Sequence, residues 1–219
     1  MDIIEKYGVK VSEKQVKDEM REFGIPVPEN VLAENPGEAE VFAEKSGLPV
    51  VMKIDSADIK HKTDVGAIKK VHCFENIRES FEELLNNVED LDADINGVLV
   101  EECVEGNEFI AGINNDPQFG KVLMFGLGGI YVEVFEDVVF RPLPIDEKDV
   151  RDMLDEIDSG KLLEGVRGQP EADRDKLVEV LMDIAKFGEN ECIRELDVNP
   201  MFVKRNTVKV GDALLELEV

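Results

Sequence analysis

Three side chains that carry oxygen ligands lie near the end of the sequence: Asp197, Asn199 and Asp212. Alternate residues of an extended strand share a face, so Asp197 and Asn199 can point the same way with Cα atoms roughly 7 Å apart. Carboxylate and amide oxygens are the ligands that Mg²⁺ prefers, and Mg²⁺ usually enters a site together with substrate phosphates. Taken alone, the three residues predict a site for Mg²⁺ or Ca²⁺, or only a solvated hairpin.

The element expected to bring these side chains together is a hairpin. If residues 204–207 form its loop, Val203 lies opposite Val208. Continuing the same pairing places Asn199 opposite Asp212 on one face of the hairpin. A Mg²⁺ ion held there calls for a phosphate site elsewhere in the chain.

Two cations interrupt otherwise apolar strands. Lys53 lies in the run VVMKI, and Arg141 lies in the run VVFRPL. A cation among buried residues needs an anionic partner, unless its stem lets the charge reach water at the strand end. For Lys53 we favour a phosphate, and for Arg141 a bidentate partner such as a phosphate or a carboxylate.

The polar loop at residues 55–66 is unusually rich in ionisable side chains. It contains Lys60, His61 and Lys62 in succession. Histidine can accept a proton or a phosphoryl group near neutral pH, although a single loop histidine is more often structural.

A glycine-rich turn follows the apolar run KVLMF and contains Gly126, Gly128 and Gly129. It lacks the lysine and hydroxyl residue that end a P-loop, and residues 130–135 are predicted to form a strand rather than a helix. What remains is a backbone turn whose N–H groups can bind an anion.

Hydrophobic periodicity and turn signals divide the chain into helices and strands. A capping box at Ser12 and Gln15 opens the first helix, on which Lys17 could reach a nucleotide phosphate but is more simply expected to be solvated. Further helices are expected at 38–45, 75–88, 149–157 and 170–187, and strands at 50–54, 98–104, 109–113, 121–125 and 138–143. A turn at 105–108 brings Glu101 near Glu108, although carboxylates at strand ends are more often solvated. The change from helix-rich to strand-rich sequence near Gly97 predicts an α/β (α+β) protein with lobes at 1–97 and 98–219.

The composition excludes some classes of protein. The 219 residues carry a formal charge of −25, so a basic surface for nucleic acid is not expected. The three cysteines form no disulfide or metal-binding pattern and fit a reducing cytoplasm. Because no signal peptide or membrane-spanning apolar run is present, we expect a soluble, cytoplasmic protein without a membrane partner.

Six motifs occur together over nearly the whole chain. They are GIPVP at 24–28, PVVMKI at 49–54, HKTDVG at 61–66, NDPQFG at 115–120, MFGLGG at 124–129 and ELDVNP at 195–200. Their joint order closely resembles the β subunit of ADP-forming acetate–CoA ligase (acetyl-CoA synthetase), an ATP-grasp family. The resemblance implies an ATP-grasp fold whose two lobes clamp a nucleotide. The implied reaction converts acyl-CoA, ADP and phosphate reversibly into free acid, CoA and ATP through an acyl phosphate and a phosphohistidine.

The resemblance also implies roles for single residues in binding the nucleotide, ATP or ADP. Lys53 would contact nucleotide phosphates, and Glu108 would hold the ribose. Glu101 and Val104 would form the adenine-side hinge, although the spacing between Glu101 and Glu108 is closer to general ATP-grasp enzymes than to the longer turn usual in this family.

For the phosphoryl group, the resemblance implies a second set of roles. His61 matches the family histidine that accepts the phosphoryl group transiently. Arg141 and the loop at 126–129 would neutralise and cradle that group. Asn199 and Asp212 would hold Mg²⁺, and Asp197 lies in the same signature.

The CoA-binding domain and the main phosphohistidine of this family belong to an α subunit, and the resemblance implies this subunit as a partner in an α2β2 assembly. Two alternatives stay open at this point. One is a carboxylate ligase of the same fold that works alone. The other is a non-catalytic module that binds a nucleotide.

Overall fold

The computed structural model describes residues 3–129, 137–165 and 171–218. It divides into two compact units, the smaller from residues 10–15 and 28–103 and the larger from residues 1–9, 16–27 and 104–219. The chain passes from one unit to the other within helix α2 (Glu13–Phe23). The capping box predicted for this helix is present, because Ser12 N donates to Gln15 Oε1 at 3.0 Å.

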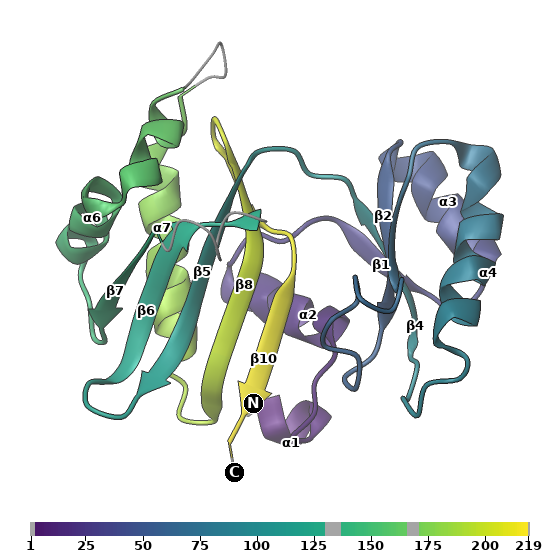
Figure 1. Cartoon of the computed structure of the whole chain (residues 1–219), viewed down its shortest axis with the longest axis horizontal. Coiled ribbons are helices and arrows are strands. Elements are labelled where there is room, and N and C mark those ends of the chain that lie inside the picture. Colours follow the sequence, from purple (N-terminus) through teal and green to yellow (C-terminus); the bar gives the residue numbers. More distant parts are fainter. Residues whose placement is uncertain (1–2, 130–136, 166–170, 219) are drawn as a thin grey trace. The chain divides into compact units, whose positions relative to one another are not determined.

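The smaller unit is a four-stranded antiparallel sheet in the order β1-β4-β2-β3. Its strands are β1 (Asn30–Ala33), β2 (Val50–Asp55), β3 (Ile68–Val71) and β4 (Gly97–Glu102). The helices α3 (Pro36–Ser46) and α4 (Ile77–Val88) lie together on one face of this sheet, and a short turn of 3₁₀ helix, η1 (Phe74–Asn76), precedes α4 (Figure 1).

Local sequence explains both helices of the smaller unit. Asn35 caps α3 by accepting a hydrogen bond from Glu38 N, and Pro36 occupies the first helical turn, where its missing N–H costs nothing. The apolar residues of α4 recur at helical spacing and pack on the sheet, with Ile77, Phe81 and Leu84 almost fully buried.

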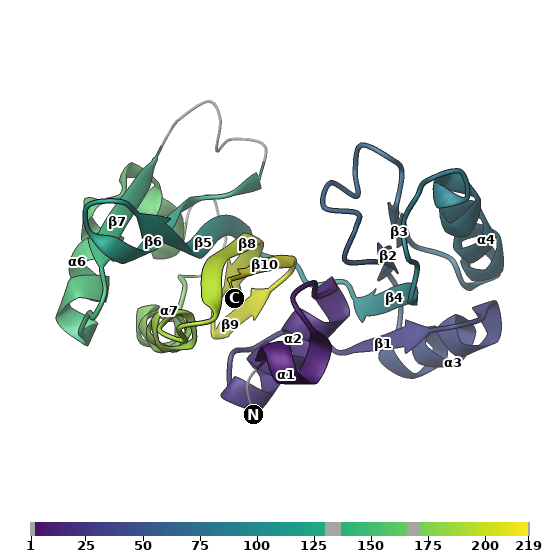
Figure 2. The same ribbon diagram turned by 90° about the horizontal axis from the view of Figure 1, so that it is seen from below.

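The larger unit is a second antiparallel sheet in the order β10-β8-β5-β6-β7, with β9 also paired to β8. Its strands are β5 (Asn107–Asp116), β6 (Gly120–Leu127), β7 (Val138–Pro142), β8 (Ile193–Lys204), β9 (Thr207–Val210) and β10 (Ala213–Leu217). Helix α7 (Arg174–Gly188) packs on β5, β8 and β9, and α6 (Glu147–Glu156) packs on β7 and α7 (Figure 2). The remaining described helices are α1 (Ile3–Tyr7) and the 3₁₀ helix η3 (Asp158–Glu164).

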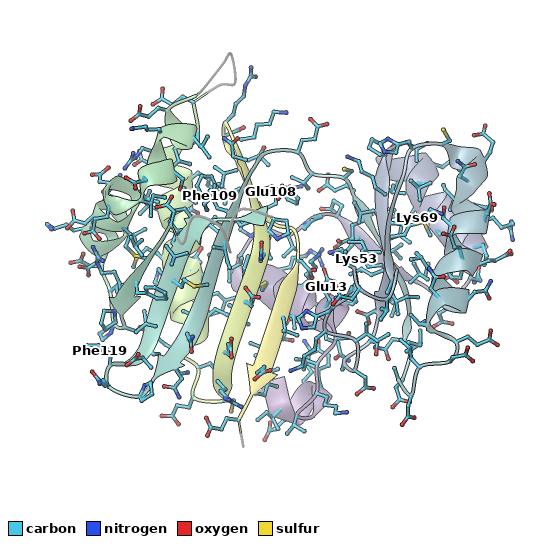
Figure 3. The ribbon with its side chains drawn as sticks, viewed as in Figure 1. Glu13, Lys53, Lys69, Glu108, Phe109 and Phe119 are labelled. Carbon is cyan, nitrogen blue, oxygen red and sulfur yellow. The ribbon has the colours of Figure 1, made fainter. Side chains whose placement is uncertain are left out.

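The core of the larger unit includes a stacked aromatic pair. The rings of Phe109 on β5 and Phe125 on β6 lie 5.3 Å apart between centroids, and both side chains are fully buried. Phe119, in the turn between these strands, is instead 64% exposed, and Figure 3 shows it at the tip of the hairpin.

The domain boundary predicted at residue 97 needs correction. Strand β4 begins at Gly97 but pairs with β1 and β2, so it belongs to the smaller unit, which continues to residue 103. Residues 1–9 and 16–27 belong to the larger unit. The change from helix-rich to strand-rich sequence marked a change in local structure. The unit to which a strand belongs is set instead by the strands with which it pairs.

The predicted elements otherwise agree with the structure to within a few residues. The helix predicted at 149–157 begins earlier, at Glu147, because Asp146 and Asp149 form a capping box. The helix predicted at 170–187 begins at Arg174 in the described part, capped by Asp173, and the predicted start at Pro170 lies outside the described residues. The strand predicted at 130–135 also lies outside them. Among the helices that the structure describes, none combines the length and apolar character needed to span a membrane.

Truncating Phe125 to Ala is expected to lower the free energy of unfolding by about 3–5 kcal/mol, because it removes a stacked ring from a closely packed core. The matched control, Phe119→Ala on the exposed turn, should change it by less than about 0.5 kcal/mol. Denaturant unfolding measures both. Equal losses in the two variants would contradict the core assignment.

Candidate functional site

The predicted hairpin forms with the predicted register. Val203 pairs with Val208, and Asn199 N donates to Asp212 O at 3.3 Å. The loop at its end is tighter than predicted, because β8 extends to Lys204 and β9 begins at Thr207.

A bulge in β8 decides which way the candidate ligands face. The pairing of β8 with β5 shifts between Phe109 and Ala111, so β8 carries an extra residue there. The buried positions of β8 accordingly change from Leu196 and Val198 to Met201 and Val203. Asp197 and Asn199 therefore both lie on the face opposite the core.

Asp212 lies on the same face of the sheet. It is half-buried, as is Leu214, while Ala213 and Leu215 between and beyond them belong to the core. Leu214 pairs directly with Asp197, which fixes the two strands on a common face. The structure thus brings the three predicted metal ligands to one surface.

The carboxylate of Asp197 fits a cation. Its Oδ1 is buried and accepts no hydrogen bond from any residue in the described ranges. Burial, and then the nearby charge of Glu195, raises the pKa of Asp197. A buried oxygen without a donor is costly to hold, and a bound cation would relieve that cost. Within the described residues no group of three or more His, Cys, Asp or Glu side chains could hold a metal, so this site would depend on two carboxylates and the Asn199 amide.

The glycine-rich turn packs against the beginning of β5. Gly128 N donates to Glu108 O at 2.9 Å, and Gly129 N donates to Asn199 Oδ1 at 3.4 Å. A Cβ added at Gly128 would lie 2.5 Å from Phe109 C, and one at Gly129 would lie 2.3 Å from Glu108 Oε2. No larger residue fits without movement, so the turn holds its backbone close to Glu108 and to one candidate metal ligand. Gly126, which was predicted to belong to the turn, lies instead inside β6, because that strand extends to Leu127.

Within the described part of the larger unit, no hydrogen bond or ion pair joins Arg141 to another predicted site residue. Its guanidinium pairs with the carboxylate of Glu156, and it donates to Phe140 O at 2.9 Å. The side chain is partly exposed. Of the two partners considered from the sequence, phosphate and carboxylate, the structure provides the carboxylate.

Lys53 is buried in the smaller unit and has carboxylate partners. Its Nζ lies 2.6 Å from Glu13 Oε1 and 3.2 Å from Glu101 Oε2. Figure 3 shows Lys53 and Glu13 side by side. The expectation that this lysine needs an anion is confirmed, with carboxylates as the anions found. The Glu101 side chain is thereby engaged with Lys53. Val104, the other predicted hinge residue, follows β4 and is half-buried.

Sequence reasoning missed the burial of two residues near the predicted sites. Glu13, at the first position of α2, also lies 3.0 Å from Lys62 Nζ through its Oε2. Lys17, expected to be solvated, is fully buried and donates to Gly211 O at 2.9 Å, next to Asp212. Helix periodicity places Lys17 one turn from Glu13 but carries no signal that either side chain is covered.

His61 is exposed on a loop that is held at several points. Asp64 N donates to His61 O at 3.3 Å, and Ala67 N donates to Lys62 O at 2.7 Å. Earlier in the loop, Asp58 is bonded to Lys10 Nζ at 2.5 Å, and this bond lowers the pKa of the Asp58 carboxyl. The histidine is therefore presented on the surface by an ordered backbone.

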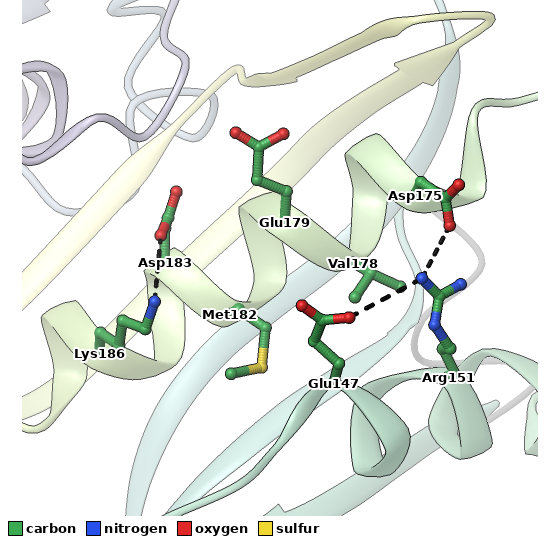
Figure 4. Close-up of a pocket in the computed structure, with 8 residues that line it drawn as sticks. All are labelled: Glu147, Arg151, Asp175, Val178, Glu179, Met182, Asp183 and Lys186. Carbon is green, nitrogen blue, oxygen red and sulfur yellow. Dashed lines mark ion pairs between the residues drawn. The ribbon is translucent and has the colours of Figure 1, made fainter.

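A separate pocket lies between α6 and α7 and has a volume of about 260 Å³ (Figure 4). Its lining includes Arg151, which lies 2.8 Å from Asp175, and Lys186, which lies 3.9 Å from Asp183. None of the predicted site residues lines it. The charged residues of its lining form ion pairs at the surface, and we assign the pocket no role.

Comparison with known proteins agrees with the fold. A family model described as ATP-grasp domain matches residues 3–217. Acetate–CoA ligase (ADP-forming) II subunit beta of Pyrococcus furiosus is 41% identical over 199 residues, which cover 88% of this chain and 84% of the relative. The corresponding I subunit beta of the same organism is 38% identical, with 99% and 97% covered.

A solved structure of acetyl-coenzyme A synthetase 1 from Ca. Korarchaeum cryptofilum, in complex with coenzyme A, Ca-AMPCP and HgCl⁺, matches with a TM-score of 0.91 and 39% identity, over 98% of this chain and 96% of that one. Another structure of that synthetase, with Mg-AMPPCP and a phosphohistidine segment pointing towards the nucleotide binding site, matches with a TM-score of 0.83 and 36% identity, over 98% and 96%. The two antiparallel sheets, together with the family match and the structural matches, identify an ATP-grasp protein. The chain belongs to the ATP-grasp family and, within it, to the β subunits of ADP-forming acetate–CoA ligases.

Replacing Asp197 by Asn in the metal-free chain is expected to raise the unfolding temperature at neutral pH. The raised pKa means that the ionised carboxylate destabilises the folded chain. This penalty is absent at pH values below the unfolded pKa of about 4, where both states are protonated, and is complete above the folded pKa. The gain from Asp197→Asn should therefore grow as the pH rises.

Thermal unfolding in the presence of EDTA, from acid to neutral pH, measures this gain. The control is Asp90→Asn, which alters an exposed carboxyl and should have little effect. An Asp197→Asn variant that melts below the wild type at neutral pH would show that the carboxylate stabilises the metal-free fold.

Proposed function

We propose that this chain is the nucleotide-binding β subunit of an ADP-forming acyl-CoA (acetyl-CoA) synthetase. The observation that carries the proposal is the surface shared by Asp197, Asn199 and Asp212. On this surface Asp197 Oδ1 is buried and accepts no hydrogen bond from the described residues, and Asn199 Oδ1 accepts one from the close-packed glycine turn. Such a surface suits a divalent cation together with phosphates. The similarity to named β subunits supports the same reading.

In the proposed site, Asp197, Asn199 and Asp212 hold Mg²⁺, which neutralises nucleotide phosphate charge when it is bound. The glycine turn cradles the phosphates, which requires the N–H groups of Gly128 and Gly129 to leave Glu108 O and Asn199 Oδ1, and Glu108 holds the ribose. Lys53 binds nucleotide phosphates, which requires them to compete with Glu13 and Glu101 for its ammonium group.

His61 is the proposed phosphoryl carrier on this chain. In the direction of ATP synthesis, the bond between an imidazole nitrogen and phosphorus breaks, and a terminal oxygen of ADP forms the new bond to that phosphorus. The histidine returns to its neutral form and can accept the next phosphoryl group. Exposure of His61 on an ordered loop supports this role, because the imidazole must reach donors and acceptors on different proteins.

The remaining parts of the reaction require a partner. We propose an α subunit that binds CoA and carries the main phosphohistidine, in an α2β2 complex in the cytoplasm. For Arg141 we keep the proposed role of neutralising the transferred phosphoryl group, which requires that it leave Glu156.

Removing the proposed phosphate and metal ligands should weaken Mg-ADP binding. We expect Lys53→Met and Asp212→Asn each to raise Kd roughly 10- to 100-fold, the loss typical of a hydrogen bond to a charged group. The matched control is Lys69→Met, which removes a partly exposed lysine on β3 of the same sheet. Isothermal titration measures the affinities, and unchanged affinity in both site variants would refute the assignment.

Replacing His61 by Ala should abolish turnover of the complex reconstituted with its α subunit, because the phosphoryl carrier is lost. His72, the chain's other histidine, is also exposed, so His72→Ala is the control and should retain full turnover. ATP formation from acetyl-CoA, ADP and phosphate is the measurement. Full activity in His61→Ala would leave this histidine without a catalytic role.

A further inference from the structure

Glu13 joins two lysines that the proposed function uses separately. One oxygen, Oε1, lies 2.6 Å from Nζ of Lys53, and the other, Oε2, lies 3.0 Å from Nζ of Lys62. Lys53 is the proposed phosphate ligand on β2, and Lys62 is the chain neighbour of His61. A single carboxylate thus links the nucleotide lysine to the loop of the phosphoryl carrier.

The cluster around Glu13 is buried and balanced in charge. The side chains of Glu13, Lys53, Glu101 and Lys62 are between 1% and 9% exposed. Two carboxylates face two ammonium groups. Buried charges persist only when they are paired. Removal of one partner leaves the other charge unpaired in the low-dielectric interior. This cluster therefore holds its members in fixed positions.

Lys62 connects that cluster to the backbone of the His61 loop. Its side chain is turned inward, whereas His61 immediately before it and Thr63 immediately after it are exposed. Its carbonyl accepts from Ala67 N at 2.7 Å, and Ala67 O in turn accepts from Ile54 N at 2.8 Å at the end of β2. The direction in which His61 points follows from where Lys62 is anchored.

We propose that Glu13 is a positioning residue for phosphoryl transfer. It holds the His61 loop through Lys62, and it links the rigidity of that loop to the binding of a nucleotide phosphate at Lys53. The proposal rests on the proposed roles of His61 and Lys53. A phosphate that attracts Lys53 competes with Glu13 for the ammonium group, and Glu13 then interacts more strongly with Lys62. Nucleotide binding accordingly tightens the loop.

Hydrogen exchange of the loop amides, measured on the full chain, tests the positioning directly. In Glu13→Gln and Lys62→Met, the amides of Asp64 and Ala67 should exchange faster than in the wild type, because the inward anchor is lost. Lys62→Arg retains the charge and should restore slow exchange. Glu83→Gln, which removes the carboxylate partner of Lys69 near the surface, is the control and should leave the loop unchanged.

Exchange with and without Mg-ADP tests the link to Lys53. We expect Mg-ADP to slow exchange at Asp64 and Ala67 in the wild type and to leave it unchanged in Glu13→Gln. Equal slowing in both proteins would overturn the link, because the nucleotide would then act on the loop without Glu13.

Turnover of the reconstituted complex separates positioning from binding. In Lys62→Met we expect kcat to fall roughly 10- to 100-fold, the loss typical of a misplaced reacting group, with KM for ADP unchanged. Lys62→Arg should recover most of kcat. Wild-type kcat together with wild-type exchange in Lys62→Met would overturn the proposal.

The double variant Glu13→Gln/Lys62→Met tests whether the loss of kcat comes only from a loss of stability. It removes both charges, so it should regain the thermal stability that the single variants lose through an uncompensated buried charge. Its kcat should remain low. If kcat recovers together with stability, Glu13 serves only the fold and the proposal fails.

The same measurements distinguish this failure from failure of the proposed function. Loop exchange is measured on the chain alone and requires no turnover. Full activity in His61→Ala would refute the carrier role whatever the loop exchange shows. A fully inactive His61→Ala variant, together with an unchanged loop in Lys62→Met, would refute only the positioning role of Glu13.

Discussion

The smaller unit depends on the pairing of four buried charges around Glu13. The carboxylates of Glu13 and Glu101 neutralise Lys53 and Lys62 inside the fold, where none of the four could remain charged alone. Each member comes from a different element: the start of α2, strand β4, strand β2 and the loop after it. The cluster therefore fixes the strand that carries Lys53 and the loop that carries His61.

In the larger unit, Asp197 lies on a sheet face with one buried carboxylate oxygen that accepts no hydrogen bond from the described residues. A bulge in β8 turns Asp197 and Asn199 away from the core, and the raised pKa of Asp197 shows the cost of burying that carboxylate. Next to it, the glycine turn approaches β5 so closely that side chains are excluded. The buried carboxylate reduces the stability of the chain by itself, and both features suit a site completed by a cation and phosphates.

Local patterns in the sequence predicted most elements and several contacts. Alternation and turn position gave the register of Val203 with Val208 and the approach of Asn199 to Asp212, because a hairpin is a short-range structure. The apolar run around Lys53 indicated correctly that its charge must be paired. The family resemblance, carried by motifs spread over the chain, supplied the fold class.

Contacts between distant segments were not predictable in this way. Glu13 carried no signal in the sequence and Lys17 was expected to be solvated, yet both are buried by segments far away in the sequence. The pairing of β4 with β1 and β2 moved the boundary between the units, and Glu156, on α6, provided the partner of Arg141. In each case tertiary contact overrode a correct local pattern.

The most direct test of the account follows a labelled phosphoryl group. The reconstituted complex, given Mg²⁺ and ATP labelled in its γ-phosphate, is stopped in alkali, and both subunits are cleaved into peptides. We expect label on the peptide that contains His61, and this label should be stable in alkali and lost in acid, as a phosphoramidate is. Label that reaches the α subunit while the His61 peptide stays unlabelled throughout the time course would contradict it.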